Sequence, residues 1–137
     1  MIYILDSSFI GAQIIPDEKD PEVYKKYAKI KQDDEKYTPH LIWYEMANIF
    51  KNLIRRNRYS YEKVLKFFPL LDAMELNCDI ASGTEYSKKL LSLCNKYDLS
   101  SYDAVYLELA ERKKAVLCTL DEKLKMAAKK HGVAVLK

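Results

Sequence analysis

The stretch that decides the fold is residues 2–9, Ile-Tyr-Ile-Leu-Asp-Ser-Ser-Phe. Ile2 to Leu5 form a continuous apolar run without polar alternation, which is typical of a strand buried on both faces in a parallel sheet. Asp6 and the two serines after it are all suitable N-cap residues, so a helix is expected to begin at once and to end before Pro16. The chain therefore places a carboxylate where a buried strand meets a helix.

The same strand-to-helix pattern returns near the end of the chain. Residues 115–119, Ala-Val-Leu-Cys-Thr, predict a second buried strand, and Asp121 precedes a predicted helix from Glu122 to His131. Strands that alternate with helices, through connections too long for hairpins, indicate an α/β fold: one three-layer α/β/α domain, residues 1–137, around a mostly parallel sheet. Further predicted elements are helices over residues 21–32, 41–56, 61–68, 84–96 and 100–112, and short extended pieces at 75–78 and 133–136.

The prolines indicate where some of these helices begin or end, and the glycines exclude one kind of binding loop. Thr38 and Pro39 are expected to open the 41–56 helix, and Pro69 is expected to end or kink the 61–68 helix, because proline disrupts a helix interior. The three glycines include no G-x-G-x-x-G or P-loop arrangement, so a nucleotide-cradling loop is not supported.

The composition is that of a chain able to build one hydrophobic core, with 137 residues of which 49% are hydrophobic. No apolar run approaches the roughly 20 residues that cross a bilayer, and Asp6 interrupts the first apolar run too early for a secretory signal. We therefore expect a cytoplasmic protein with no membrane partner. The net charge of +3 permits nucleic-acid binding without arguing strongly for it.

Cysteine and histidine are scarce, which limits the available chemistry. Cys78, Cys94 and Cys118 are odd in number and show no C-x-x-C spacing, so they are expected to be core thiols in a reducing compartment. His40 and His131 are the only histidines, too few for a histidine-rich metal site or a histidine-dependent triad. A metal ion in this chain would have to be held by oxygen.

Three aspartates could supply that oxygen, although each has a simpler explanation. Asp6 and Asp121 stand where helix N-caps stand. Asp103 fits the capping-box spacing Ser100-x-x-Asp103. Taken singly, none of these residues requires a function.

Glu45 is different because it interrupts the apolar stripe of the 41–56 helix. Leu41 and Ile49 lie four residues before and after it, so its carboxylate is expected on the apolar face of that helix. Burying an unpaired carboxylate is costly, which leaves a basic residue, a hydrogen-bond network, protonation or a metal ion as its partner. Asn48 shares this flank and is a further polar candidate. The alternative is an edge position from which the carboxylate reaches water.

The acids are more informative together than singly. The carboxyl ends of parallel strands share one edge of a sheet, where ligands bind, and Asp6 and Asp121 are both expected there. Thr119, two residues before Asp121, points to the same face and can donate a hydrogen bond to a carboxylate. If Glu45 and Asp103 converge with them, the four carboxylates form a pocket for a hard divalent cation.

These acids, within residues 5–9 (LDSSF), 101–107 (SYDAVYL) and 119–121 (TLD), give the chain a resemblance to PIN-domain ribonucleases. It most resembles the VapC-type toxins of bacterial and archaeal toxin–antitoxin pairs, over the whole chain from Asp6 onward. The resemblance implies an α/β/α PIN fold and a metal-dependent endoribonuclease that hydrolyses RNA phosphodiester bonds. It implies Mg²⁺ or Mn²⁺ in a pocket formed by Asp6, Glu45, Asp103 and Asp121, with Thr119 as a polar helper. It also implies a cognate antitoxin protein that covers the pocket.

Two further sets of residues have candidate roles. The basic candidates for holding RNA, each of which is otherwise a solvated surface charge, are Lys51, Arg55, Arg56, Arg58, Lys123 and Lys125. The aromatic candidates for a homodimer interface, for which a core role is equally open, are Tyr59, Tyr61, Phe67 and Phe68.

Two other functions remain open at the level of sequence. A receiver-like signalling domain would also hold Mg²⁺ with acids, but it predicts paired acids after the first strand, where this chain has Ser7 and Ser8 after Asp6. A non-catalytic PIN-like module that binds RNA or a protein partner is the other alternative, and the complete set of four acids argues against it.

Overall fold

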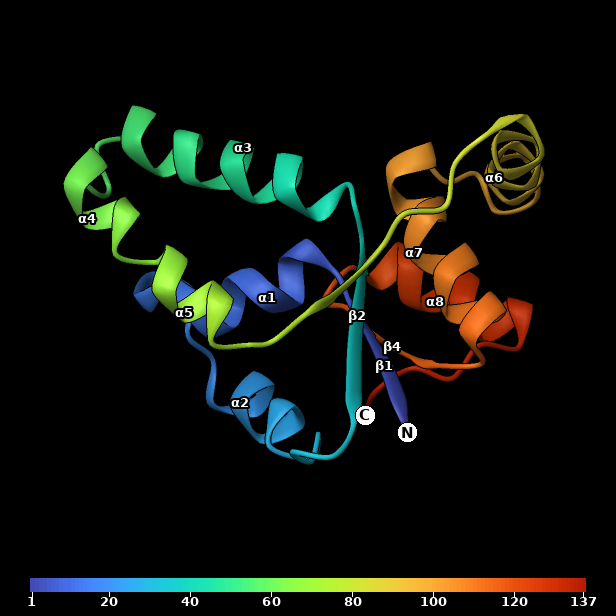
Figure 1. Ribbon diagram of the computed structural model, residues 1–137, viewed down its shortest axis with the longest axis horizontal. Coiled ribbons are helices and arrows are strands. Elements are labelled where there is room, and N and C mark those ends of the chain that lie inside the picture. Colours follow the sequence, from blue (N-terminus) through green and yellow to red (C-terminus); the bar gives the residue numbers. More distant parts are fainter.

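Four parallel strands form the central sheet, in the order β3-β2-β1-β4. The computed structural model describes all residues from Met1 to Lys137. The strands are β1 (Ile2–Leu5), β2 (Glu35–Pro39), β3 (Asn77–Asp79) and β4 (Val116–Cys118). Because every pair is parallel, the carboxyl ends of the strands lie along one edge of the sheet, which is the upper edge for β1 and β2 in Figure 1.

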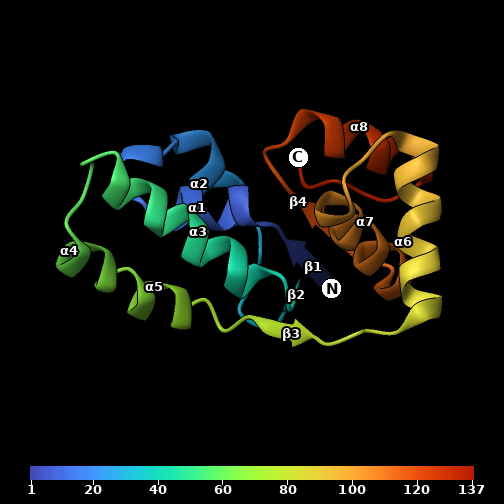
Figure 2. The same ribbon diagram turned by 90° about the horizontal axis from the view of Figure 1, so that it is seen from above.

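Helices cover both faces of this sheet (Figures 1 and 2). One layer contains α1 (Ser7–Ile14), a 3₁₀ turn at Pro16–Glu18, α2 (Pro21–Tyr27), α3 (Ile42–Arg55), α4 (Tyr61–Leu65) and α5 (Phe68–Asp72). The opposite layer contains α6 (Thr84–Tyr97), α7 (Ser101–Lys113) and α8 (Glu122–His131). The three-layer α/β/α architecture around a parallel sheet is therefore confirmed.

Strand β1 separates two hydrophobic cores. Leu5 packs with Phe9 and Phe50 in the layer of α1 and α3, whereas Ile4 packs with Leu107 in the layer of α7 and α8. Ile4 and Leu5 are both fully buried. This is the two-sided burial that a continuous apolar run predicts.

The predicted helix caps are present. The Asp6 carboxylate accepts the Phe9 backbone N–H at 2.9 Å, and the Asp121 carboxylate accepts the Leu124 backbone N–H at 3.0 Å. Ser100 caps α7 through the backbone N–H of Asp103. The caps fix the directions in which these helices leave the strand ends.

Strand β2 is absent from the sequence prediction, which read Thr38 and Pro39 as the opening of the next helix. Its sequence, Glu-Lys-Tyr-Thr-Pro, is mostly polar and has little intrinsic strand character. The strand forms because β1 and β3 pair with it on both sides. Pairing in the folded sheet thus overrides a weak local preference.

Three other predicted boundaries are corrected. Pro69 lies in the first turn of α5, directly after Phe68, instead of ending a helix, because the N–H that proline lacks would have no helical partner in a first turn. The 21–32 helix stops at Tyr27. The predicted strand at 133–136 is reduced to a single bridge between Leu117 and Val135.

An ion-pair network ties β3 to α7. Arg112 donates two hydrogen bonds to the Asp79 carboxylate, at 3.0 and 2.7 Å, and its Nε donates to Glu108 at 2.7 Å. Glu108 is only 2% exposed, and its charge is compensated by this guanidinium and, at 3.7 Å, by the ammonium group of Lys89. Hydrogen bonds from Arg112 hold the pKa of the Asp79 carboxyl below its ordinary value.

Replacing Arg112 with methionine should lower the free energy of unfolding by about 3 kcal/mol, since it leaves the buried Glu108 carboxylate with Lys89, at 3.7 Å, as its one remaining basic partner. The folded-state pKa of Asp79 is depressed, so the stability that its ionised carboxylate contributes is present above the ordinary carboxyl pKa. That contribution is lost as pH falls through the folded-state pKa. Urea unfolding at neutral and acidic pH measures both effects. Lys88→Met is the matched control, since Lys88 pairs with an exposed Glu85; equal losses in the two variants would contradict the account.

Candidate active site

The four predicted acids each stand at the start of a different helix. Asp6 and Asp121 are the N-caps of α1 and α8, and Glu45 and Asp103 lie in the first turns of α3 and α7. Helix N-termini carry partial positive charge, which favours carboxylates there. The topology brings these four helix starts to the carboxyl edge of the sheet, so the acids face a shared region.

Asp6 is the most constrained of the four, with 5% of its surface exposed. Besides the Phe9 N–H, its carboxylate accepts hydrogen bonds from Ser8 Oγ at 2.7 Å and from Thr119 Oγ1. Thr119 Oγ1 also accepts the Asp121 backbone N–H at 3.0 Å. Thr119 therefore joins the loop after β4 to the acid after β1.

Glu45 lies at the flank of the apolar face of α3, not at its centre. The buried stripe of this helix consists of Ile42, Met46, Phe50 and Leu53, and Glu45 is only half-buried. Its carboxylate accepts hydrogen bonds from Tyr106 Oη and from Ser7 Oγ at 3.3 Å. Glu45 is thus oriented by α1 and α7 as well as by its own helix.

Burial raises the pKa of the Asp6, Glu45 and Asp103 carboxyls. The negative charge of Asp121 raises the pKa of Asp6 and of Asp103 further, and Asp6 and Asp103 do the same for Glu45. Charge repulsion therefore links the four carboxylates in a ring, through the pairs Asp6–Asp121, Asp121–Asp103, Asp103–Glu45 and Glu45–Asp6. None of the four forms an ion pair with a lysine or arginine.

The donor chemistry of this cluster fits Mg²⁺ or Mn²⁺. The candidate ligands are all carboxylate oxygens, which hard divalent cations prefer, and none of them forms an ion pair with a basic side chain; Lys123, the basic residue that acts on Asp103, is paired with Asp98. No three His, Cys, Asp or Glu side chains already lie as close together as the ligands of a bound ion. The acids are close enough to repel one another but are not drawn into contact.

Removing one of these charges should stabilise the metal-free protein. Because the folded-state pKa of Asp103 is raised, its favourable contribution is complete below the ordinary carboxyl pKa and is lost as pH rises. Asp103→Asn should therefore raise the melting temperature in chelator by a few degrees at neutral pH and by less in acid. Asp72→Asn, at an exposed position of α5, serves as the control; an equal rise there, or a fall for Asp103→Asn, would contradict mutual repulsion.

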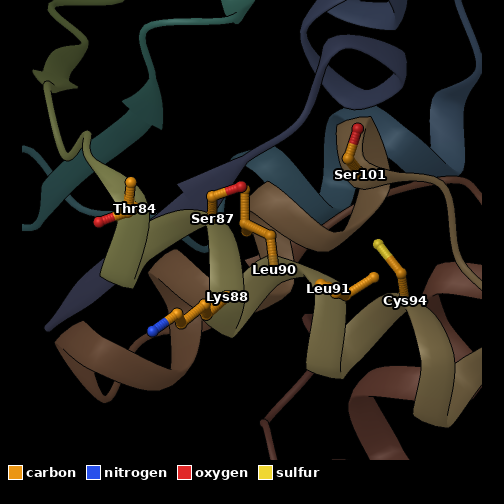
Figure 3. Close-up of a pocket in the computed structure, with 7 residues that line it drawn as sticks. All are labelled: Thr84, Ser87, Lys88, Leu90, Leu91, Cys94 and Ser101. Atoms are coloured by element: carbon orange, nitrogen blue, oxygen red, sulfur yellow. The ribbon is translucent and has the colours of Figure 1, made fainter.

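A hollow of about 420 Å³ lies directly beside Glu45, lined by Leu41, Tyr44, Glu45, Asn48 and Tyr102. A different hollow, of about 480 Å³, lies along α6. Figure 3 shows six of its lining residues on α6 and the seventh, Ser101, at the start of α7. The α6 hollow contains none of the four acids, whereas the hollow at Glu45 is lined by one of them.

The structure divides the basic candidates into two groups. Arg58 pairs with Asp17 at 3.0 Å, and Lys123 and Lys125 form ion pairs with Asp98 and Glu122, respectively. The basic candidates without an ion pair are Lys51, Arg55 and Arg56, all exposed at the end of α3. Lys123, two residues after Asp121, is the basic candidate whose charge acts on the acids, because it partly offsets the rise in the pKa of Asp103.

The aromatic and cysteine candidates also separate. Phe67 is a core residue and Tyr59 packs against the same core, whereas Tyr61 and Phe68 are exposed and line an apolar groove between α3 and α4. Cys118 is buried as predicted. Cys78 and Cys94 are only partly buried and no disulfide forms, so the expectation of core thiols holds for one cysteine alone.

Tyr106 is the functional candidate that sequence reasoning missed. It is 2% exposed, and burial together with the adjacent Glu45 charge raises the pKa of its hydroxyl, so it stays a hydrogen-bond donor. The available signal was its spacing, since Tyr106 follows Asp103 by three residues and therefore shares its helix face. Its contact with Glu45, 61 residues away in sequence, could not be inferred from spacing.

Comparison with known families matches residues 3–130 to the PIN domain. The chain belongs to the PIN domain family. This PIN domain is 30% identical over 131 residues to Ribonuclease VapC3 of Pyrobaculum aerophilum, with 90% of the chain and 92% of that relative aligned. The resemblance to VapC-type PIN domains is thereby confirmed, and the receiver-like alternative is excluded.

Solved structures confirm the fold of this PIN domain. PAE2754 from Pyrobaculum aerophilum superposes with a TM-score of 0.73 at 21% identity, covering 98% of this chain and 89% of that chain. VapBC2 from Rickettsia felis, bound to a DNA fragment from their promoter, gives a TM-score of 0.69 at 15% identity and covers 98% and 97%. No helix of this PIN domain is both long and apolar enough to cross a membrane.

Proposed function

We propose that this PIN domain is an endoribonuclease that hydrolyses RNA phosphodiester bonds with Mg²⁺ or Mn²⁺, and that it is the toxin of a toxin–antitoxin pair. The observation that carries the proposal is the ring of four carboxylates at four helix starts, linked by charge repulsion and forming no ion pair with a lysine or arginine. The relative that aligns with 90% of the chain is named a ribonuclease, which supports RNA as the substrate.

In this proposal Asp6, Glu45, Asp103 and Asp121 hold the metal. A bound divalent ion would lower the pKa of a water molecule and offset negative charge on the phosphate. Asp6 is held in one orientation by Ser8, Thr119 and the Phe9 N–H, so it acts as the fixed point of the pocket. Glu45 and Asp103, half-buried and with raised pKa values, are suited to accept the proton that the attacking water loses. No covalent enzyme intermediate is needed.

The toxin assignment predicts a protein partner. Two solved structural neighbours are described as VapBC complexes, one from Rickettsia felis and one from nontypeable Haemophilus influenzae. By analogy, we propose that a cognate antitoxin binds this chain and covers its acidic pocket. Copurification with a protein encoded beside it, together with loss of RNA cleavage in the complex, would support this assignment.

The test of the proposed activity is cleavage of RNA by the purified chain, free of any inhibitor protein. We expect endonucleolytic cleavage with Mg²⁺ or Mn²⁺ that stops when a chelator is added and resumes when the metal is restored in excess. RNA binding without cleavage would instead favour the non-catalytic module. Cleavage that is indifferent to chelator would contradict metal-dependent hydrolysis.

A further inference from the structure

The hollow beside Glu45 has a lining that suits one class of ligand. It lies between the first turns of α3 and α7, with Tyr44 and Asn48 contributed by α3 and Tyr102 by α7. Glu45 belongs both to this lining and to the ring of acids. We propose that the hollow binds one unpaired nucleobase of the RNA, adjacent to the phosphate at the acids. This inference rests on the proposed function and names a feature of its substrate.

The two tyrosines provide the aromatic surface for such a base. Tyr44 and Tyr102 are 63% and 62% exposed, which is unusual for large rings and leaves their faces open to a ligand. His40 packs edge-on against Tyr44, with ring centroids 5.8 Å apart at 68°, and so supports that ring from one side. Exposed tyrosines are common stacking platforms for unpaired bases, because every base has a flat aromatic face.

Asn48 supplies the polar element of the hollow. Its side chain is exposed and makes no hydrogen bond within the protein, so both the donor and the acceptor of its amide are free. An amide of this kind can bond the edge of a base in the plane of the ring. Leu41 adds an apolar contact from the residue before α3.

The chemistry of this hollow differs from that of the groove between α3 and α4. That groove, of about 500 Å³, is lined mainly by apolar side chains, among them Phe50, Val64 and Phe68, as a protein segment would require. The hollow at Glu45 instead combines a carboxylate, an amide and two phenols. A flat ring with polar edges matches this mixture better than the apolar face of a protein does.

The proposal is tested by binding of a fluorescent base. Single-stranded RNA that the wild type cleaves is made with 2-aminopurine at either nucleotide beside the cleaved bond, and is titrated into the Asp6→Asn variant, so that cleavage does not interfere. We expect quenching at one of the two positions, because stacking quenches this base. Tyr102→Ala in the same background should abolish most of the quenching and weaken binding about tenfold or more.

Two controls separate stacking from general damage. Tyr102→Phe keeps the ring and should keep the quenching, and Tyr61→Ala removes an equally exposed tyrosine outside the hollow and should have no effect. Unchanged quenching in Tyr102→Ala, or an equal loss in Tyr61→Ala, would overturn the proposal. So would a Tyr102→Ala variant that binds RNA normally but loses a protein partner, since the hollow would then be a protein-docking surface.

Failure of the proposed function gives a different result. If no RNA is cleaved with either metal, the same titration is made with single-stranded RNA of mixed sequence carrying 2-aminopurine. Quenching that depends on Tyr102 would then support base binding in the hollow, although the proposed nuclease activity would be wrong. Absence of quenching would also contradict the proposal that the hollow binds a nucleobase.

Discussion

Replacing Asp6 with asparagine is expected to lower kcat for RNA cleavage about a thousandfold or more, because the pocket loses its fixed, negatively charged oxygen ligand. The fold should survive the change. Asparagine retains an oxygen that can accept the Phe9 N–H, so the cap of α1 remains. The measurement is single-turnover cleavage of a defined RNA with Mn²⁺, accompanied by circular dichroism of the variant.

Asp20→Asn is the matched control for this prediction. Asp20 is also an N-cap aspartate, with its carboxylate accepting the Glu22 N–H at 2.9 Å, but it caps α2 and faces solvent. We expect its cleavage rate to equal that of the wild type. If wild type and Asp6→Asn cleave RNA alike, the cleavage comes from a contaminating nuclease, and the assignment of the pocket fails.

The second large effect is expected at Tyr106. Tyr106→Phe removes only the hydroxyl that donates to Glu45, and residues that orient metal ligands typically contribute about 10- to 100-fold to metal affinity or activity. We expect cleavage to fall within that range and the half-saturating Mn²⁺ concentration to rise. A shift in metal dependence separates positioning of Glu45 from a loss of packing, which would leave that concentration unchanged.

Tyr97→Phe provides the comparison, since its hydroxyl also forms a hydrogen bond inside the protein, to His131 at 2.7 Å. That bond lies away from the acids, so this variant should lose some thermal stability while retaining its metal dependence. If Tyr106→Phe shows the same half-saturating Mn²⁺ concentration as the wild type, Tyr106 does not position Glu45.

The parts of the fold that could be predicted are those with local causes. The run Ile2–Leu5 is apolar on both faces and becomes a doubly buried strand, and Asp6 and Asp121 become caps because short acceptors stabilise helix starts. Convergence of the acids could be anticipated from parallel topology, which places strand ends on one edge. Both aspartates are helix caps, as the simple explanation predicts, and both also belong to the ring of four acids.

The parts that could not be predicted depend on contacts between distant segments. Strand β2 exists because its neighbours pair with it, and its own residues give little indication of this. Glu45 interrupts the apolar sequence pattern, but small rotations of α3 decide whether it faces the core or its flank. Its hydrogen bonds to Ser7 and Tyr106 connect α3 to α1 and α7. The residue spacing within one helix cannot predict a contact between different helices.

The most direct test of the central claim is calorimetric titration of Mn²⁺ into the inhibitor-free protein and into four single variants. The variants are Asp6→Asn, Glu45→Gln, Asp103→Asn and Asp121→Asn. The account predicts saturable Mn²⁺ binding by the wild type and at least about tenfold weaker binding by every variant, because all four carboxylates serve one pocket. The absence of binding by the wild type, or wild-type affinity in any of the four variants, would contradict it.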